Sequence, residues 1–229
     1  MPTNCYCCDR ESTSVEHVPP KCLFPAKKDA PNGVNLRRNL ITVPSCDMHN
    51  QEKAGDDEYL LYVLSMAAPS GRGGFEHFSS KVSRAMDRRP ALARSFLARS
   101  RNVEVAKAGA EANEMAMAVQ EDGARLQRSL ELIAFGLYRH HTGKRWRGRI
   151  KVVPEFMHFI EDEKADEWNE IYQKTARDAD QLFANAPLQG ENPTVFRYQI
   201  LIPEPDQPCA VRMHFYDNTR VTALLLTDA

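Results

Sequence analysis

The sequence predicts an α+β fold, and three observations support this prediction. Short-spaced pairs of cysteine and histidine are confined to the first quarter of the chain, where they indicate a small metal-stabilised module. Apolar residues in the middle of the chain recur with helical periodicity. After residue 193, alternating runs separated by turn residues are typical of antiparallel strands. We therefore expect a module at residues 1–66, followed by an α+β domain at residues 75–229, mainly helical at first and ending in antiparallel strands.

Two ligand pairs in the module have the spacing of a structural zinc site. Two residues separate Cys5 from Cys8, and two residues separate Cys46 from His49. Such pairs suit a tetrahedral site of three cysteines and one histidine, with Cys7 as an alternative to Cys8. The chain has six cysteines in 229 residues and shows no secretory signal. This composition favours reduced thiols and a cytoplasmic location.

A second group of polar residues lies between and beside these ligands. Glu16 and His17 precede a Val-Pro-Pro sequence, Asn39 comes later, and Asn50 directly follows the last zinc ligand. An imidazole with a pKa of about 6.5 can take a proton from water at neutral pH. The oxygens of Glu16 and Asn50 suit a hard cation such as Mg²⁺. A metal held by two side chains keeps positions open for water and a phosphate oxygen.

These residues resemble the motif of the zinc-containing HNH nucleases, over roughly residues 4 to 58. The family has an acidic residue or His followed by His, then Asn, then Asn or His at the start of a helix. The resemblance implies a ββα-metal fold around one divalent ion, Mg²⁺ or Mn²⁺. It implies that His17 is the general base, that Glu16 and Asn50 bind the ion, and that Asn39 has an orienting role. The implied substrate is DNA, with RNA as an alternative.

Three functions remain open on the sequence alone. The first is a metal-dependent endonuclease. The second is a non-enzymatic zinc module that supports a nucleic-acid or protein binding surface. The third is a defence nuclease that a signal switches on through the C-terminal domain. For residues 75–229 the sequence leaves open substrate positioning, homodimer formation and sensing.

Charge restricts where nucleic acid could bind. The net charge of −1 excludes a globally basic protein, so a nucleic-acid surface must be local. Cations suit phosphates, and an aromatic ring suits stacking on a base. The candidate contacts are a weaker one at Lys53 and a basic run of Lys144, Arg145, Trp146, Arg147 and Arg149. The alternative for this run is a solvated strand. No apolar stretch approaches the ~20 residues of a membrane span, so we expect no membrane partner.

Local patterns predict most of the elements. The helix after Cys46 should carry an apolar stripe of Leu60, Leu61 and Leu64, and should end in a flexible hinge at residues 67–74. Asp122 and Gly143 should bound the clearest helix. The other expected elements are strands near 13–17 and 40–43, two helices within 75–103, a hairpin across 103–119, a helix at 165–184, a linker at 187–193, and strands at 194–202, 210–216 and 220–227.

Overall fold

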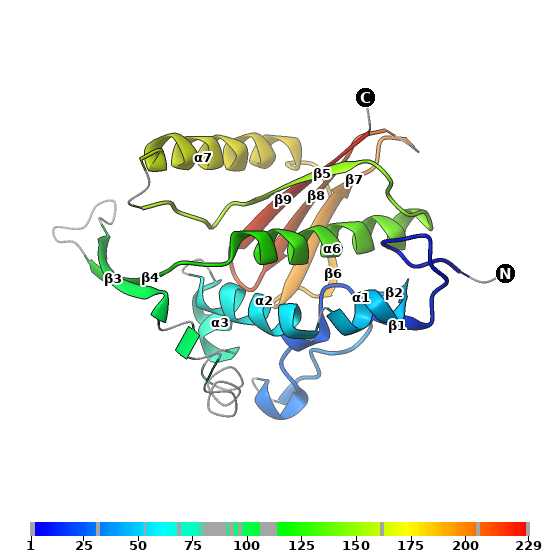
Figure 1. The fold of residues 1–229 in the computed structure, drawn as a ribbon, viewed down its shortest axis with the longest axis horizontal. Coiled ribbons are helices and arrows are strands. Elements are labelled where there is room, and N and C mark those ends of the chain that lie inside the picture. The colour runs from blue at the N-terminus through cyan, green and yellow to red at the C-terminus, as the bar shows by residue number, and fades with distance from the viewer. Residues whose placement is uncertain are drawn as a thin grey trace.

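A five-stranded antiparallel sheet forms the centre of the C-terminal half (Figure 1). Its strands lie in the order β5-β9-β8-β7-β6. They are β5 (Arg149–Pro154), β6 (Gln189–Asn192), β7 (Phe196–Leu201), β8 (Cys209–Phe215) and β9 (Thr219–Leu226). The three predicted C-terminal strands are confirmed. The predicted linker is wrong, because β6 occupies most of it as an edge strand. Its sequence Gln-Gly-Glu-Asn has no apolar alternation that could have indicated a strand.

The computed structural model describes residues 3–30, 33–52, 54–67, 70–77, 79, 91, 94–95, 98–105, 114–160, 163–204 and 207–227. Most of the segment expected to form two helices between residues 75 and 103 lies outside these ranges, and so does Lys53. None of the helices in the described part of the chain combines the length and the apolar character that a membrane span requires.

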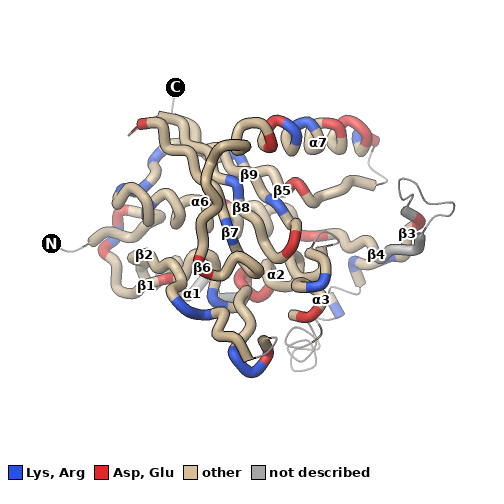
Figure 2. The backbone as a smooth tube through the Cα atoms, turned by 180° about the vertical axis from the view of Figure 1, so that it is seen from behind, with Lys and Arg blue, Asp and Glu red and all other residues tan. Residues whose placement is uncertain are grey.

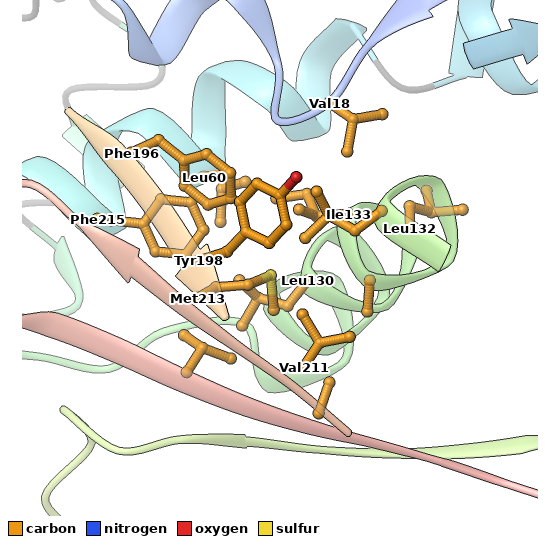
Figure 3. Close-up of a cluster of buried hydrophobic side chains, with 14 of the residues drawn as sticks. Val18, Leu60, Leu130, Leu132, Ile133, Phe196, Tyr198, Val211, Met213 and Phe215 are labelled. Carbon is orange, nitrogen blue, oxygen red and sulfur yellow. The ribbon is translucent and has the colours of Figure 1, made fainter. Parts of the chain in front are cut away.

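One helix covers each face of the sheet (Figure 1). Helix α6 (Gly123–Thr142) begins at Asp122, whose side chain accepts a hydrogen bond from the Arg125 N–H at 3.2 Å. It ends at Gly143, which has the left-handed φ of 69°. Both boundaries were predicted. Figure 3 shows Leu130 and Ile133 of α6 facing the sheet residues Tyr198, Val211 and Met213 in one buried cluster. The opposite face of the sheet is covered by α7 (Ala165–Leu182).

The N-terminal module contains a two-stranded ribbon followed by helices. Strand β1 (Ser14–His17) pairs antiparallel with β2 (Thr42–Ser45), and α1 (Asp47–Glu52) and α2 (Ala54–Met66) follow. Two short 3₁₀ turns, η1 (Lys21–Leu23) and η2 (Lys27–Asp29), lie in the loop between the strands. The second strand begins two residues later than predicted and includes Pro44, which a two-stranded ribbon tolerates at its edge. The predicted stripe of α2 is buried.

The expected hinge at residues 67–74 is wrong, because α3 (Gly71–His77) occupies its second half. Its glycines serve close packing rather than flexibility. A Cβ added at Gly74 would lie 2.5 Å from the Ser70 Cβ. Phe75 in the same helix has 67% of its surface exposed. The hairpin is confirmed as β3 (Ser100–Val105) paired with β4 (Glu114–Val119).

The N-terminal module and the C-terminal half share one buried cluster. Tyr6, Val18 and Leu23 of the module belong to the same cluster as α6 and the sheet. The Tyr216 hydroxyl donates to the Leu23 carbonyl at 3.2 Å. The Asn192 amide donates to the Arg38 carbonyl at 3.0 Å. Packing across the boundary expected near residue 70 is therefore continuous.

Gly136 marks the closest approach between α6 and the module. A Cβ at this position would lie 2.5 Å from Val18 Cγ2 and 2.9 Å from Cγ1. We expect Gly136→Ala to lower the free energy of unfolding by about 1–3 kcal/mol, because the branched side chain of Val18 cannot move far enough to make room for the added methyl group. This cost exceeds the gain of about 1 kcal/mol in helix propensity. Urea unfolding measures it.

Gly123→Ala is the matched control in the same helix. A Cβ there would lie 3.6 Å from Glu121 Oε1, which is an ordinary contact. This variant should be as stable as the parent or more so. Equal stability of both variants would show that α6 does not hold Val18 tightly.

Candidate metal centre and catalytic site

Four side chains from two distant segments meet between the N-terminal turn and α1. Cys5, Cys8, Cys46 and His49 each offer one ligand atom, and these atoms all lie within 4.8 Å of one another. The Sγ atoms of Cys8 and Cys46 are 3.8 Å apart. His49 Nδ1 lies 3.3, 3.6 and 3.7 Å from the Sγ atoms of Cys46, Cys5 and Cys8.

These separations can be compared with those of a tetrahedral ion. With Zn–S bonds of about 2.3 Å and Zn–N bonds of about 2.0–2.1 Å, the ligand atoms would be about 3.8 Å (S to S) and about 3.5 Å (S to N) apart. The four atoms of the cluster are therefore spaced to hold one metal ion such as zinc. Cys7 lies outside this group of ligands.

Backbone N–H groups point at the three sulfur atoms in a repeated pattern. The Cys7 N–H donates to Cys5 Sγ at 3.5 Å. The backbone of Arg10 donates to Cys8, and the backbones of Met48 and His49 donate to Cys46. Each sulfur thus receives a donor from the residue two positions later. Such donors favour the thiolate form that a metal requires.

The thiols of Cys8 and Cys46 respond differently to this environment. Burial raises the pKa of Cys8, and its backbone hydrogen bond does not offset the rise. Burial also opposes ionisation of Cys46, but the His49 backbone N–H and the thiols of Cys8 and Cys5 outweigh it, so the pKa of Cys46 is lowered. Of these two thiols, Cys46 is therefore the one that ionises more readily.

Ribbon register places Glu16 and His17 on opposite faces. Side chains of neighbouring residues in a strand alternate, and directly paired residues share a face. Glu16 pairs with Val43, and both are buried on what we call the inner face, which is turned toward the core. His17 pairs with Thr42 on the outer face, where His17 is half-buried and Thr42 is exposed.

On the inner face, a chain of hydrogen bonds connects Glu16 with Asn50. The Asn50 amide donates to the Ser14 hydroxyl at 3.2 Å, and Ser14 donates to the Ser45 carbonyl at 3.2 Å. The hydroxyls of Ser45 and Tyr6 both donate to Glu16 Oε2 at 3.5 Å. Burial and the charge of Glu16 raise the pKa of Tyr6 well above its ordinary value, which keeps this hydroxyl a donor.

This arrangement corrects one expectation about the helix start. Ser45 stands before the helix, where a serine is expected to accept from the first backbone N–H groups. Its hydroxyl instead donates to Glu16 and to the Cys46 carbonyl, and the Asn50 N–H bonds to the Cys46 carbonyl at 3.1 Å. Cys46 is therefore the residue that begins the hydrogen bonding of the helix.

His17 has an electrostatic environment that suits a base. Burial lowers its pKa, the positive charges of Lys21 and Arg37 lower it further, and Glu16 opposes them in part. The imidazole is therefore mainly neutral at pH 7. The Arg37 guanidinium is fixed by a 2.9 Å hydrogen bond from Nε to the Phe24 carbonyl.

Sequence analysis did not identify Lys21 and Arg37 as site residues. A signal was present in the segment between β1 and β2, which we call the cationic loop (residues 18–41). The loop contains five basic residues, Lys21, Lys27, Lys28, Arg37 and Arg38, against one acidic residue, Asp29. These five cations are spread along the loop and do not form one basic run, so the pattern of adjacent basic residues did not indicate them.

Asn39 lies at the end of the cationic loop in a left-handed turn with φ of 50°. Asparagine tolerates this conformation better than most residues. The side chain is exposed, and within the described part of the chain no hydrogen bond from it is found. Its orienting role therefore stays a prediction.

The basic run after Gly143 differs from the expected nucleic-acid surface. Only 9% of Trp146 is exposed. Its ring meets Tyr138 edge-on at 5.1 Å, and its Nε1 donates to the Arg149 carbonyl at 3.2 Å. Trp146 is thus a buried core side chain, and its burial contradicts the expectation that it stacks on a base.

The neighbouring arginines bind a residue of the metal module. Arg145 and Arg147 each donate to the Asp9 carboxylate at 3.0 Å. Their charge is therefore partly neutralised, whereas Lys144 and Arg149 are exposed. Nucleic-acid binding by these four residues stays a prediction, and Lys53 lies outside the described residues.

No family model, curated protein or solved structure matches this chain. Its function is therefore argued from the chemistry of the site itself.

Proposed function

We propose that the protein is a metal-dependent endonuclease of the HNH type that hydrolyses phosphodiester bonds of DNA. One observation carries the proposal. His17, whose pKa is lowered, ends a ribbon whose flanking segments both contribute ligands to the metal cluster, and it lies near the cations Lys21 and Arg37. A neutral imidazole beside fixed positive charge suits the activation of water next to a phosphate.

Each group of residues has its own role in the proposed reaction. His17 takes a proton from the attacking water. Lys21 and Arg37 offset the negative charge that builds on the phosphate. A structural zinc ion bound by Cys5, Cys8, Cys46 and His49 joins the N-terminal turn to the start of α1, and so fixes the ribbon between them.

Glu16 and Asn50 provide the oxygen donors for a second ion. The carboxylate of Glu16 and the amide oxygen of Asn50 are of the types that Mg²⁺ or Mn²⁺ prefers, and hydrogen bonds through Ser14 and Ser45 connect the two residues. The donor types suit a hard cation, although the ribbon register turns Glu16 to the face opposite His17. When bound, it would stabilise charge on the phosphate and on the leaving 3′ oxygen.

A second candidate function is a non-enzymatic zinc module that binds nucleic acid or protein. The burial of Glu16 favours it. This carboxylate is only 6% exposed and accepts from Tyr6 and Ser45, as a structural residue would.

Supercoiled plasmid separates the two candidates. The nuclease should nick it when Mg²⁺ or Mn²⁺ is added and should not nick it when the metal is left out. Glu16→Gln keeps an acceptor for Tyr6 and Ser45 but removes the charge, so it should reduce nicking while the melting temperature stays unchanged. His158→Ala, at an exposed histidine remote from the ribbon, should nick like the parent. Absence of nicking under every metal condition would favour the binding module.

A further inference from the structure

A groove of about 540 Å³ lies where the N-terminal module meets the C-terminal half. One wall comes from the module and includes Val18, Asn39 and Thr42. The other wall comes from the end of α6 and from β6, and includes His140, Gln189 and Asn192. Its volume is within the ~300–1,000 Å³ that is usual for small-molecule sites.

The groove opens beside the proposed base. Thr42 lines it and is the direct cross-strand partner of His17 on the outer face of the ribbon. Val18, the residue after His17, also lines it. The groove therefore reaches the residues on either side of the imidazole, the next residue in the chain and the cross-strand partner.

The groove offers both apolar and polar groups. Phe24, Phe196 and Tyr198 contribute to its lining, and the rings of Phe196 and Tyr198 are stacked at 5.7 Å. In Figure 3 the Tyr198 ring lies beside Phe196 with its hydroxyl directed toward the side where Val18 lies. The Tyr198 hydroxyl is within 2.9 Å of His141 Nε2, which fixes the ring. Apolar surface with polar groups at the rim suits a nucleobase.

Two residues of the cationic loop, Arg37 and Arg38, are bonded to residues that line the groove. Arg37 bonds the carbonyl of the lining residue Phe24, and the Arg38 carbonyl accepts from the lining residue Asn192. Figure 2 shows the Lys and Arg positions of this loop in blue, below β1 and β6. With five basic residues and one acidic residue, the loop attracts a phosphate.

A second hollow of similar volume, about 510 Å³, lies beside α7 and is lined in part by Asp166, Glu170, His158 and Gln173. Its lining contains two acids, the lining of the groove contains one, Glu191, and neither lining includes a Lys or Arg. The hollow is less suited to an anion than the groove, whose lining residues Phe24 and Asn192 are hydrogen-bonded to Arg37 and Arg38.

We propose that the groove holds one nucleotide of the DNA substrate, with its base against the apolar lining and its phosphate toward Lys21, Arg37 and Arg38. This inference rests on the proposed function. It assigns a role to the C-terminal half, which builds one wall of the substrate site.

The test removes polar groups from the C-terminal wall only. His140→Ala with Gln189→Ala is made in the His17→Ala background, where uncut DNA can be titrated. Fluorescence anisotropy measures the binding of three fluorescein-labelled probes of about 16 nucleotides. They are a DNA duplex, one of its single strands, and an RNA strand of the same sequence. Loss of two hydrogen-bonding groups should raise the Kd for DNA about tenfold. The matched control is His158→Ala with Gln173→Ala, which removes the same residue types from the acidic hollow and should leave the Kd unchanged.

The outcomes separate this inference from the proposed function. Weaker binding by the groove pair, with no cleavage by the parent, would support the groove and overturn the nuclease. Metal-dependent cleavage by the parent, with an unchanged Kd in the groove pair, would overturn the groove alone. A larger loss on RNA than on DNA would overturn DNA as the occupant. If the alanine pair loses zinc, His140→Phe with Gln189→Leu keeps the side-chain volume and repeats the test.

Discussion

His17→Ala should lower the rate of metal-dependent DNA cleavage by about 10²- to 10⁴-fold, because a positioned general base typically contributes this much. That loss corresponds to about 3–5 kcal/mol of transition-state stabilisation. The imidazole is on the outer face of the ribbon, away from the metal cluster, so zinc content and DNA affinity should stay near those of the parent. Single-turnover cleavage of a labelled duplex measures the rate, and anisotropy measures the affinity. A fall in affinity as large as the fall in rate would make His17 a binding residue.

The pH dependence of the parent provides a second readout for the same residue. Only the neutral imidazole can accept a proton, so cleavage should rise with pH through the pKa of His17. Because burial and the charges of Lys21 and Arg37 lower this pKa, the midpoint should lie below the ordinary value of about 6.5. Lys21→Ala removes one of these charges and should move the midpoint upward. A midpoint well above 6.5 in the parent would contradict the assignment.

Cys46→Ser should release the bound metal and unfold the N-terminal module. Metal binding in small zinc modules supplies on the order of 10 kcal/mol of folding free energy. Cys46 is central to the cluster, since its Sγ lies 3.3 Å from His49 Nδ1 and 3.8 Å from Cys8 Sγ. Zinc content by elemental analysis should fall from one equivalent to none. Hydrogen exchange should show lost protection in β1, β2 and α1.

Cys7→Ser is the matched control, because Cys7 lies next to a ligand but outside the cluster. It should keep both its zinc and its melting temperature, whereas Cys8→Ser should behave like Cys46→Ser. Loss of zinc from Cys7→Ser with retention in Cys8→Ser would reverse the assignment of the second ligand.

The sequence predicts those parts of the fold in which local chemistry decides the conformation. The α6 boundaries follow from an aspartate that caps the first turn and a glycine that adopts a left-handed φ. The metal ligands are predictable because the spacing of each pair suffices to place both its members on one ion. Edge strand β6 and helix α3 were missed, because they are stabilised by packing against distant residues rather than by periodicity.

The orientation of site residues was harder to predict. Glu16 and His17 are neighbours in the sequence, which suggested that they share one site. Side chains alternate in direction along a strand, however, so these two lie on opposite faces of the ribbon. Trp146 within a basic run looked like a stacking residue, but contact with Tyr138 makes it part of the core. Lys21 and Arg37 influence His17 from 4 and 20 positions away, through the path of a loop that no pattern specifies.

The two ion pairs at Asp9 have a consequence for any preparation of this protein. Asp9 lies just beyond Cys8 and neutralises part of the charge of Arg145 and Arg147. We expect a molecule that lacks the proposed metal to lose the turn that positions this carboxylate, which would make both guanidinium groups available to polyanions. Partially demetallated samples would then retain more DNA on a filter while cutting less of it. Metal stoichiometry therefore has to accompany every affinity quoted for the protein.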